Sequence, residues 1–122
     1  MNQKEELEST FIEEYSSALL LIKLQKRKSA LILLSKSLFA LADYFIYSDT
    51  MTLPKNHSER FRILKETDKN TYAILDEVWN KYTETYSKPA MSESISMIKN
   101  GIKKICENNE RVSEKIKKAV NE

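Results

Sequence analysis

Residues 29–64 read SALILLSKSLFALADYFIYSDTMTLPKNHSERFRIL, and the apolar pattern of this segment decides the fold. Apolar side chains recur three and four positions apart, the spacing of one face of an α-helix, at Leu31, Leu34, Leu38, Leu41 and Phe45. The pattern predicts a buried helix over residues 29–48. Pro54 prevents this helix from continuing, and a short helix is predicted over residues 58–66. The only histidine, His57, therefore lies where two helices meet.

The composition is that of one helical domain spanning residues 1–122. One glycine and two prolines are far below average usage, which argues against a turn-rich β protein. Hydrophobic residues make up 41% and charged residues 31%, enough apolar residues for one core and too many for a disordered chain. The net charge of +2 means that a nucleic-acid site would need a local basic patch. The single cysteine, Cys106, excludes an internal disulfide, and we interpret it as a packing residue.

Three further helices are predicted from the same periodicity, over residues 4–25, 71–86 and 92–119. In the first of these, Leu19 and Leu20 are expected to widen the buried stripe. One continuous helix over residues 4–49 would be about 70 Å long, too long for a compact domain of this size. We therefore predict a reversal at residues 25–29, with Ser29 as the N-cap of the next helix. Together these elements predict an all-α fold: an up-down-up-down four-helix bundle with a short extra helix after the second helix.

The apolar runs at residues 18–22 and 30–34 are short and flanked by charge. A membrane span needs about 20 apolar residues, so we predict no membrane insertion and expect no membrane partner. The first ten residues are polar and acidic, which is not the pattern of a signal peptide. We predict a cytoplasmic location, which the single cysteine also fits.

His57 is the main candidate for a functional residue, because an imidazole titrates near neutral pH. Lys55, Arg60 and Arg62 lie close by in sequence and are candidates for holding a phosphate group. The alternative interpretation is a histidine near a helix start with ordinary surface charges around it. We expect no metal, because one histidine and one distant cysteine give no ligand spacing. We expect no cofactor either, because the only glycine, Gly101, leaves no Gly-rich phosphate loop.

Asp43 and Tyr47 lie four positions apart on the helix that leads to His57, and they are candidates for orienting its ring. The alternative is that they form the polar edge of that helix. The basic residues at 23–28 are a second candidate phosphate site, although a solvated turn explains them equally. The aromatic residues of the fourth helix, Tyr72, Trp79, Tyr82 and Tyr86, suit either base stacking or contacts in the core or at a dimer interface.

Three segments resemble the HEPN domain, a small α-helical bundle: LSKSLFALADYFIY at 34–47, LPKNHSERFRIL at 53–64 and YTETYSKPA at 82–90. The resemblance covers about residues 5–105. Such domains often accompany minimal nucleotidyltransferases in archaea and bacteria. The resemblance therefore implies a homodimer whose partner is a nucleotidyltransferase, a nucleotide or RNA, or the other component of a toxin–antitoxin pair.

Several HEPN proteins are ribonucleases with an arginine four to six residues before a histidine. No arginine precedes His57 at that distance; Arg60 and Arg62 follow it. The resemblance therefore favours a non-catalytic interaction module. The alternative is a divergent, metal-independent ribonuclease that uses His57 with Arg60 or Lys55. A third possibility is plain helical scaffolding, for which the isoleucine stripe at residues 95–105 would provide a docking face.

Overall fold

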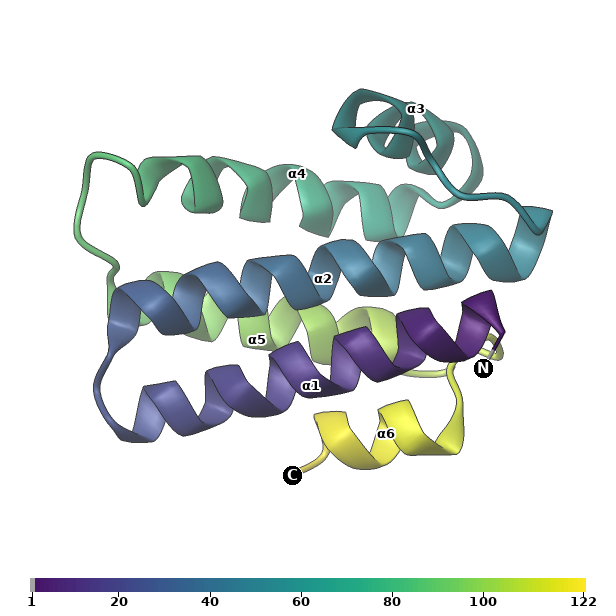
Figure 1. The fold of residues 1–122 in the computed structure, drawn as a ribbon. Helices are drawn as coiled ribbons and strands as arrows, with labels where there is room; N and C mark the ends of the chain where they lie inside the picture. Colours follow the sequence, from purple (N-terminus) through teal and green to yellow (C-terminus); the bar gives the residue numbers. More distant parts are fainter. Residues whose placement is uncertain (1) are drawn as a thin grey trace.

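The computed structural model describes residues 2–122, which form six α-helices and no strand (Figure 1). The helices are α1 (Gln3–Lys23), α2 (Arg27–Thr50), α3 (His57–Thr67), α4 (Lys69–Glu84), α5 (Ser92–Cys106) and α6 (Glu114–Val120). The predicted all-α class is confirmed. In Figure 1 the long axes of α1, α2, α4 and α5 run roughly alongside one another, with successive helices reversed in direction.

α2 is the central helix of the molecule, in contact with α1, α3, α4 and α5. More than half of its residues are buried, and they lie on nearly all sides of the helix. A helix that is apolar all round is stable in water only when other elements cover it. The predicted stripe is confirmed, because Leu31, Leu34, Leu38, Leu41 and Phe45 are all at most 2% exposed.

The turn between α1 and α2 spans residues 24–26 and confirms the predicted reversal. Gln25 adopts a φ of 59°, in the left-handed region, and the backbone N–H of Lys26 donates to the carbonyl of Leu21 at 2.9 Å. The prediction of Ser29 as N-cap is wrong: Lys26 occupies the N-cap position and α2 starts at Arg27. The tight hydrogen-bonded turn, rather than a capping side chain, sets the start of α2.

α3 begins at His57, one residue earlier than predicted, because the Asn56 side chain caps it by accepting from the backbone N–H of Glu59 at 2.9 Å. Asp68 ends α3 and caps α4 by accepting from the backbone N–H of Thr71. α3 packs on both α2 and α4. This placement brings the start of α3 over the side of the two longer helices.

The prediction of one long final helix over residues 92–119 is wrong. α5 ends at Cys106, Asn108 adopts a φ of 53°, and the separate helix α6 begins after its N-cap, Ser113. The apolar spacing nevertheless continues through Val112 and Ile116, and both residues are buried. They are buried because α6 turns back to pack on α1 and α5, as Figure 1 shows.

α2 is also the one helix among the described residues that is long and apolar enough to cross a membrane. Of its most apolar 18-residue window, 72% is buried against the rest of the protein. The core helix of a soluble protein meets the same length and hydropathy criterion. Such a helix is covered by other helices, as α2 is here. The predicted location in the cytoplasm stays a prediction.

Candidate functional site

Three of the six predicted site residues, Asp43, His57 and Arg60, come together where the start of α3 crosses α2. The guanidinium of Arg60 donates from Nε to Oδ1 of Asp43 at 2.6 Å and from a terminal nitrogen to Oδ2 at 2.9 Å. The side chains are only 12% and 17% exposed. A bidentate contact of this kind fixes the relative orientation of the guanidinium and the carboxylate, and it is stronger than an ion pair with one hydrogen bond. The geometry therefore makes Arg60 and Asp43 a pair that joins α3 to α2.

The imidazole of His57 lies against Arg60 on one side and against aromatic rings on the other. Its Nδ1 contacts a terminal nitrogen of Arg60, and its ring centroid is 4.5 Å from that of Trp79 and 5.2 Å from that of Phe39. Guanidinium nitrogens only donate hydrogen bonds, so Nδ1 is the acceptor and the proton of the neutral ring is on Nε2.

The pKa of His57 is lowered from its ordinary value. Burial against the rings is the largest cause, the positive charge of Arg60 adds to it, and the carboxylate of Asp43 acts in the opposite direction. The ring is therefore neutral at pH 7. With Nδ1 occupied and a proton on Nε2, His57 presents a hydrogen-bond donor and no free lone pair.

The structure does not bring the other three predicted residues into this group. Lys55 and Arg62 have exposed side chains, and within residues 2–122 neither side chain makes a hydrogen bond or ion pair. Lys55 takes part only through its backbone N–H, which donates to Glu59 at 3.2 Å. Tyr47 is half-buried on α2, and its hydroxyl makes no hydrogen bond to the described residues. The predicted phosphate-binding group of Lys55, Arg60 and Arg62 is therefore not assembled as one site.

A row of aromatic rings continues from His57 along α4. Trp79 and Tyr82 have centroids 5.7 Å apart, and Tyr82 and Tyr86 follow at 6.3 Å. Phe39 of α2 lies beneath them, with centroids 5.7 Å from Trp79 and 5.3 Å from Tyr82. Trp79 and Tyr82 are half-buried and Tyr86 is 80% exposed. We call His57, Trp79, Tyr82 and Tyr86 the aromatic surface.

A second polar cluster, not predicted from the sequence, centres on Arg111 in the loop between α5 and α6. Its guanidinium donates to Asp49 at 2.9 Å and to Asp68 at 2.7 Å, and its Nε donates to Asn109 at 3.1 Å. The guanidinium also lies 4.2 Å from the centroid of Phe45, which is a cation–π distance. Arg111 thereby joins the end of α2, the start of α4 and the last loop.

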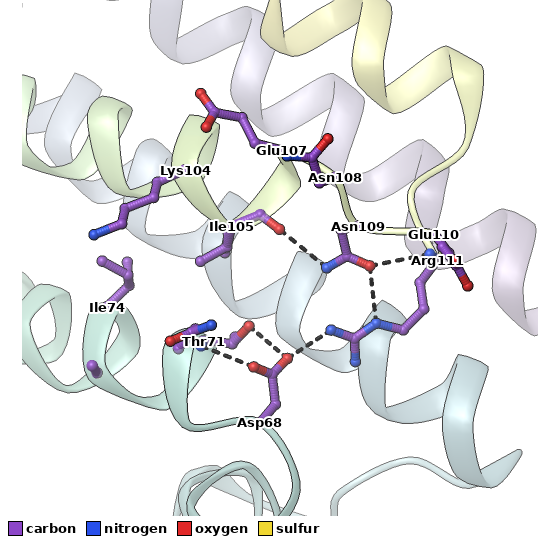
Figure 2. A pocket seen from close by; sticks show the side chains of 12 residues that line it. Asp68, Thr71, Ile74, Lys104, Ile105, Glu107, Asn108, Asn109, Glu110 and Arg111 are labelled. Atoms are coloured by element: carbon purple, nitrogen blue, oxygen red, sulfur yellow. Dashed lines mark hydrogen bonds and ion pairs between the residues drawn. The ribbon is translucent and has the colours of Figure 1, made fainter.

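This cluster forms one wall of a cleft of about 570 Å³ (Figure 2). Ile74 of α4 and Ile105 of α5 supply an apolar side, and Lys104 of α5 also lines the cleft. Burial acts to raise the pKa of Asp68, but hydrogen bonds from Arg111 and Thr71 outweigh it and lower this pKa. The buried polar groups are satisfied by one another, so the cleft holds a structural network.

Two local signals in the sequence point to this loop. The Asn108–Asn109 pair suits a left-handed residue, since asparagine tolerates that conformation better than most, and Ser113 followed by Glu114 is a helix start. No signal joins Arg111 to Asp68, which lies 43 positions away.

No group of three metal-ligating side chains exists among residues 2–122. Cys106 is buried, and burial raises the pKa of its thiol to about 12, so it is neither a ligand nor a nucleophile at neutral pH. Its interpretation as a packing residue agrees with its burial.

Comparison with known proteins returns no family model, no curated protein and no solved structure that matches this chain. The HEPN resemblance therefore rests on the three sequence segments alone.

Proposed function

We propose that this protein is a non-catalytic, HEPN-like interaction module that binds a protein partner through its aromatic surface. The proposal includes an up-down-up-down four-helix arrangement of α1, α2, α4 and α5, to which α3 and α6 are added. We also propose that the protein forms a homodimer, and that its partner is a minimal nucleotidyltransferase or a toxin–antitoxin component.

The observation that carries the proposal is the contrast between the polar and aromatic parts of the site. Arg60 and Asp43 are engaged with each other, and Nδ1 of His57 accepts from Arg60. No catalytic group is left free in this cluster. Beside it, the rings of Trp79, Tyr82 and Tyr86 remain partly or largely exposed. Tyr and Trp are the residues enriched at interface hot spots, because they bury much apolar area and keep a polar tip.

The charges around the aromatic surface favour a protein partner over RNA or a nucleotide. α3 and α4 carry five basic residues and five acidic residues, so this side of the molecule has no net attraction for a phosphate backbone. The acidic residues are Glu59, Glu66, Asp76, Glu77 and Glu84, and the basic ones are Arg60, Arg62, Lys65, Lys69 and Lys81. RNA and nucleotide binding therefore rank behind a protein contact.

The test compares the wild-type chain with Tyr86→Ala, in which the most exposed ring of the surface is removed. Tagged versions of both are used to recover partners from the native cell, the protein partner is identified, and its Kd is measured with purified components. We expect Tyr86→Ala to weaken that Kd by tenfold or more, since an interface hot spot is worth at least about 2 kcal/mol. Leu53→Ala is the matched control, because Leu53 is an exposed apolar residue in the loop between α2 and α3.

Equal binding by Tyr86→Ala and wild type would place the contact elsewhere and contradict the proposal. A strictly monomeric chain that recovers no protein would contradict it as well.

A further inference from the structure

Four basic residues gather at the turn between α1 and α2. Lys23, Lys26, Arg27 and Lys28 are all exposed, and none forms an ion pair within residues 2–122. The chain has no acidic residue between Glu14 and Asp43. These four positive charges are therefore presented to solvent without compensation.

Two leucines lie exposed among these charges. Leu20 is 58% exposed and Leu24 is 56% exposed, so the expectation that Leu20 widens the buried stripe is wrong. They are four positions apart, Leu20 in the last turn of α1 and Leu24 at its C-cap, with Lys23 between them in sequence. We call Leu20, Leu24 and the four basic residues at 23–28 the basic–apolar tip.

The loop between α4 and α5 extends the tip. Figure 1 shows this loop and the α1–α2 turn at the same end of the molecule, and Leu31 of α2 lines one small cavity together with Lys88 and Met91 of the loop. Met91 is 56% exposed. Of the six large hydrophobic residues that are exposed, four lie at this end: Leu20, Leu24, Tyr86 and Met91.

Little negative charge opposes the tip. Glu84 pairs with Lys81 at 3.9 Å, which leaves exposed Glu93, at the start of α5, as the acidic residue nearest to this loop. The turn is also held in one conformation by two backbone hydrogen bonds, from Gln25 to Ile22 at 3.0 Å and from Lys26 to Leu21 at 2.9 Å. Binding therefore does not have to order the turn first, which lowers its entropic cost.

Three kinds of partner could use the positive charges and exposed leucines of the tip to different extents. An RNA backbone would use the four cations and leave the leucines in water. A protein would use both, but it would need an acidic and apolar surface of matching shape. The face of an anionic bilayer uses both without such a match: Lys and Arg meet the headgroups, and short apolar side chains enter the boundary of the acyl region. We propose that the basic–apolar tip docks this protein on the surface of an anionic lipid bilayer.

This mode of contact differs from the insertion that the sequence argues against. The expectation of no membrane partner depended on the absence of a free apolar span, and a peripheral contact needs none. α2 stays in the core, and only the side chains of the tip meet the lipid. Tyr86 lies at the same end of the molecule, but the variants tested below leave it and the rest of the aromatic surface unchanged, so the two proposals are tested separately.

The experiment is sedimentation of the full chain with lipid vesicles. Neutral vesicles of phosphatidylcholine are compared with vesicles that contain 30 mol% phosphatidylserine, an anionic lipid. Two variants are tested: Lys26→Ala with Arg27→Ala and Lys28→Ala, and Leu20→Ser with Leu24→Ser. We expect the wild type to bind the anionic vesicles. The basic variant should lose on the order of 100-fold in partition coefficient, and the leucine variant roughly tenfold.

The matched control is Lys115→Ala with Lys117→Ala and Lys118→Ala, which removes the same charge from exposed positions on α6. It should bind within about twofold of the wild type. Circular dichroism establishes that every variant is folded. The proposal is overturned if the wild type does not bind anionic vesicles, or if the α6 variant loses as much binding as the tip variant. Undiminished vesicle binding by the leucine variant would also overturn it, because the contact would then be purely electrostatic. A purely electrostatic patch would bind RNA equally well, and binding of a single-stranded RNA 20-mer would reveal this.

Discussion

The guanidinium of Arg111 donates a 2.7 Å hydrogen bond to Oδ2 of Asp68, and this contact ties the last loop to the start of α4. We expect Arg111→Ala to lower the free energy of unfolding by about 2–3 kcal/mol, because it leaves the largely buried carboxylate of Asp68 without its cation and uncovers Phe45. Urea denaturation followed by circular dichroism measures the loss.

The control is Lys117→Ala, which breaks the exposed pair with Glu114 and should cost less than about 0.5 kcal/mol. The pH dependence gives a second check. The lowered pKa of Asp68 means that its contribution is present above about pH 4 and is lost as the pH falls through the folded pKa. In Arg111→Ala the loss of stability below pH 4 should therefore be smaller than in the wild type.

The titration of His57 is directly measurable, because it is the only histidine. We expect its NMR ring-proton signals to titrate below the ordinary value of about 6.5, since burial and Arg60 both disfavour the imidazolium. Asp43→Asn removes the opposing charge and should lower this pKa further. A titration midpoint above 6.5 in the wild type would contradict the placement of the ring.

The same shift has a consequence for stability. A lowered folded pKa means that the unfolded chain binds the proton more readily, so the contribution of His57 is complete above about pH 6.5 and is lost as the pH falls through the folded pKa. We expect the Tm of the wild type to fall between pH 7 and pH 5. His57→Gln should show a shallower fall over the same range.

Purified protein is expected to leave RNA uncut. Nδ1 of His57 faces Arg60 and Nε2 carries a proton, so no free base is available, and Arg60 is held by Asp43. The measurement is incubation of a labelled single-stranded RNA with wild type and with His57→Ala. Cleavage by the wild type that His57→Ala abolishes would instead support the divergent ribonuclease.

Gly101 lies where α5 crosses α4, and a methyl group there would meet Cγ2 of Ile74 at 2.7 Å. Gly101→Ala is therefore expected to lower the free energy of unfolding by about 1–3 kcal/mol, although alanine is the better helix former. Ile74→Ala removes the opposing atom, so the double variant should recover part of the loss. Asn100→Ala, at the exposed neighbouring position, should be neutral or slightly stabilising.

Tyr15 has a fully buried hydroxyl with no hydrogen-bond partner among residues 2–122. We expect Tyr15→Phe to raise the free energy of unfolding by about 1 kcal/mol, because it removes a desolvated polar group and keeps the ring. Tyr44→Phe is the comparison: its hydroxyl donates to the carbonyl of Arg111 at 2.9 Å, so its removal should be destabilising.

The helical class and three of the long helices were predictable because their signals are local. Apolar spacing predicted α1, α2 and α4 to within a few residues of their observed ends, whereas the predicted N-cap of α2 was wrong. The split between α5 and α6 was missed because the spacing of Ile105, Asn109, Val112 and Ile116 is helical throughout. The spacing of apolar residues indicates which residues are buried, not whether the helix is continuous. Val112 and Ile116 are buried because α6 packs on α1, and the same spacing would result from one continuous helix.

The candidate site was predicted in part for a similar reason. Asp43, His57 and Arg60 meet because α3 folds back on α2 after a short loop. The contacts of Arg111 depend on where three distant segments end, and no pattern in the sequence records that. Leu20 was misplaced because two adjacent leucines fit one buried stripe, and only the packing decides which of them faces water.

α6 has seven residues, too few to remain helical in isolation. Its helix and its docking on α1 and α5 must therefore form and dissolve as one cooperative unit. Arg111 and the buried side chains of Val112 and Ile116 hold that unit in place. Amide hydrogen exchange in residues 107–122 should accordingly proceed through a local opening of lower free energy than global unfolding, while the amides of α2 exchange only when the whole domain unfolds.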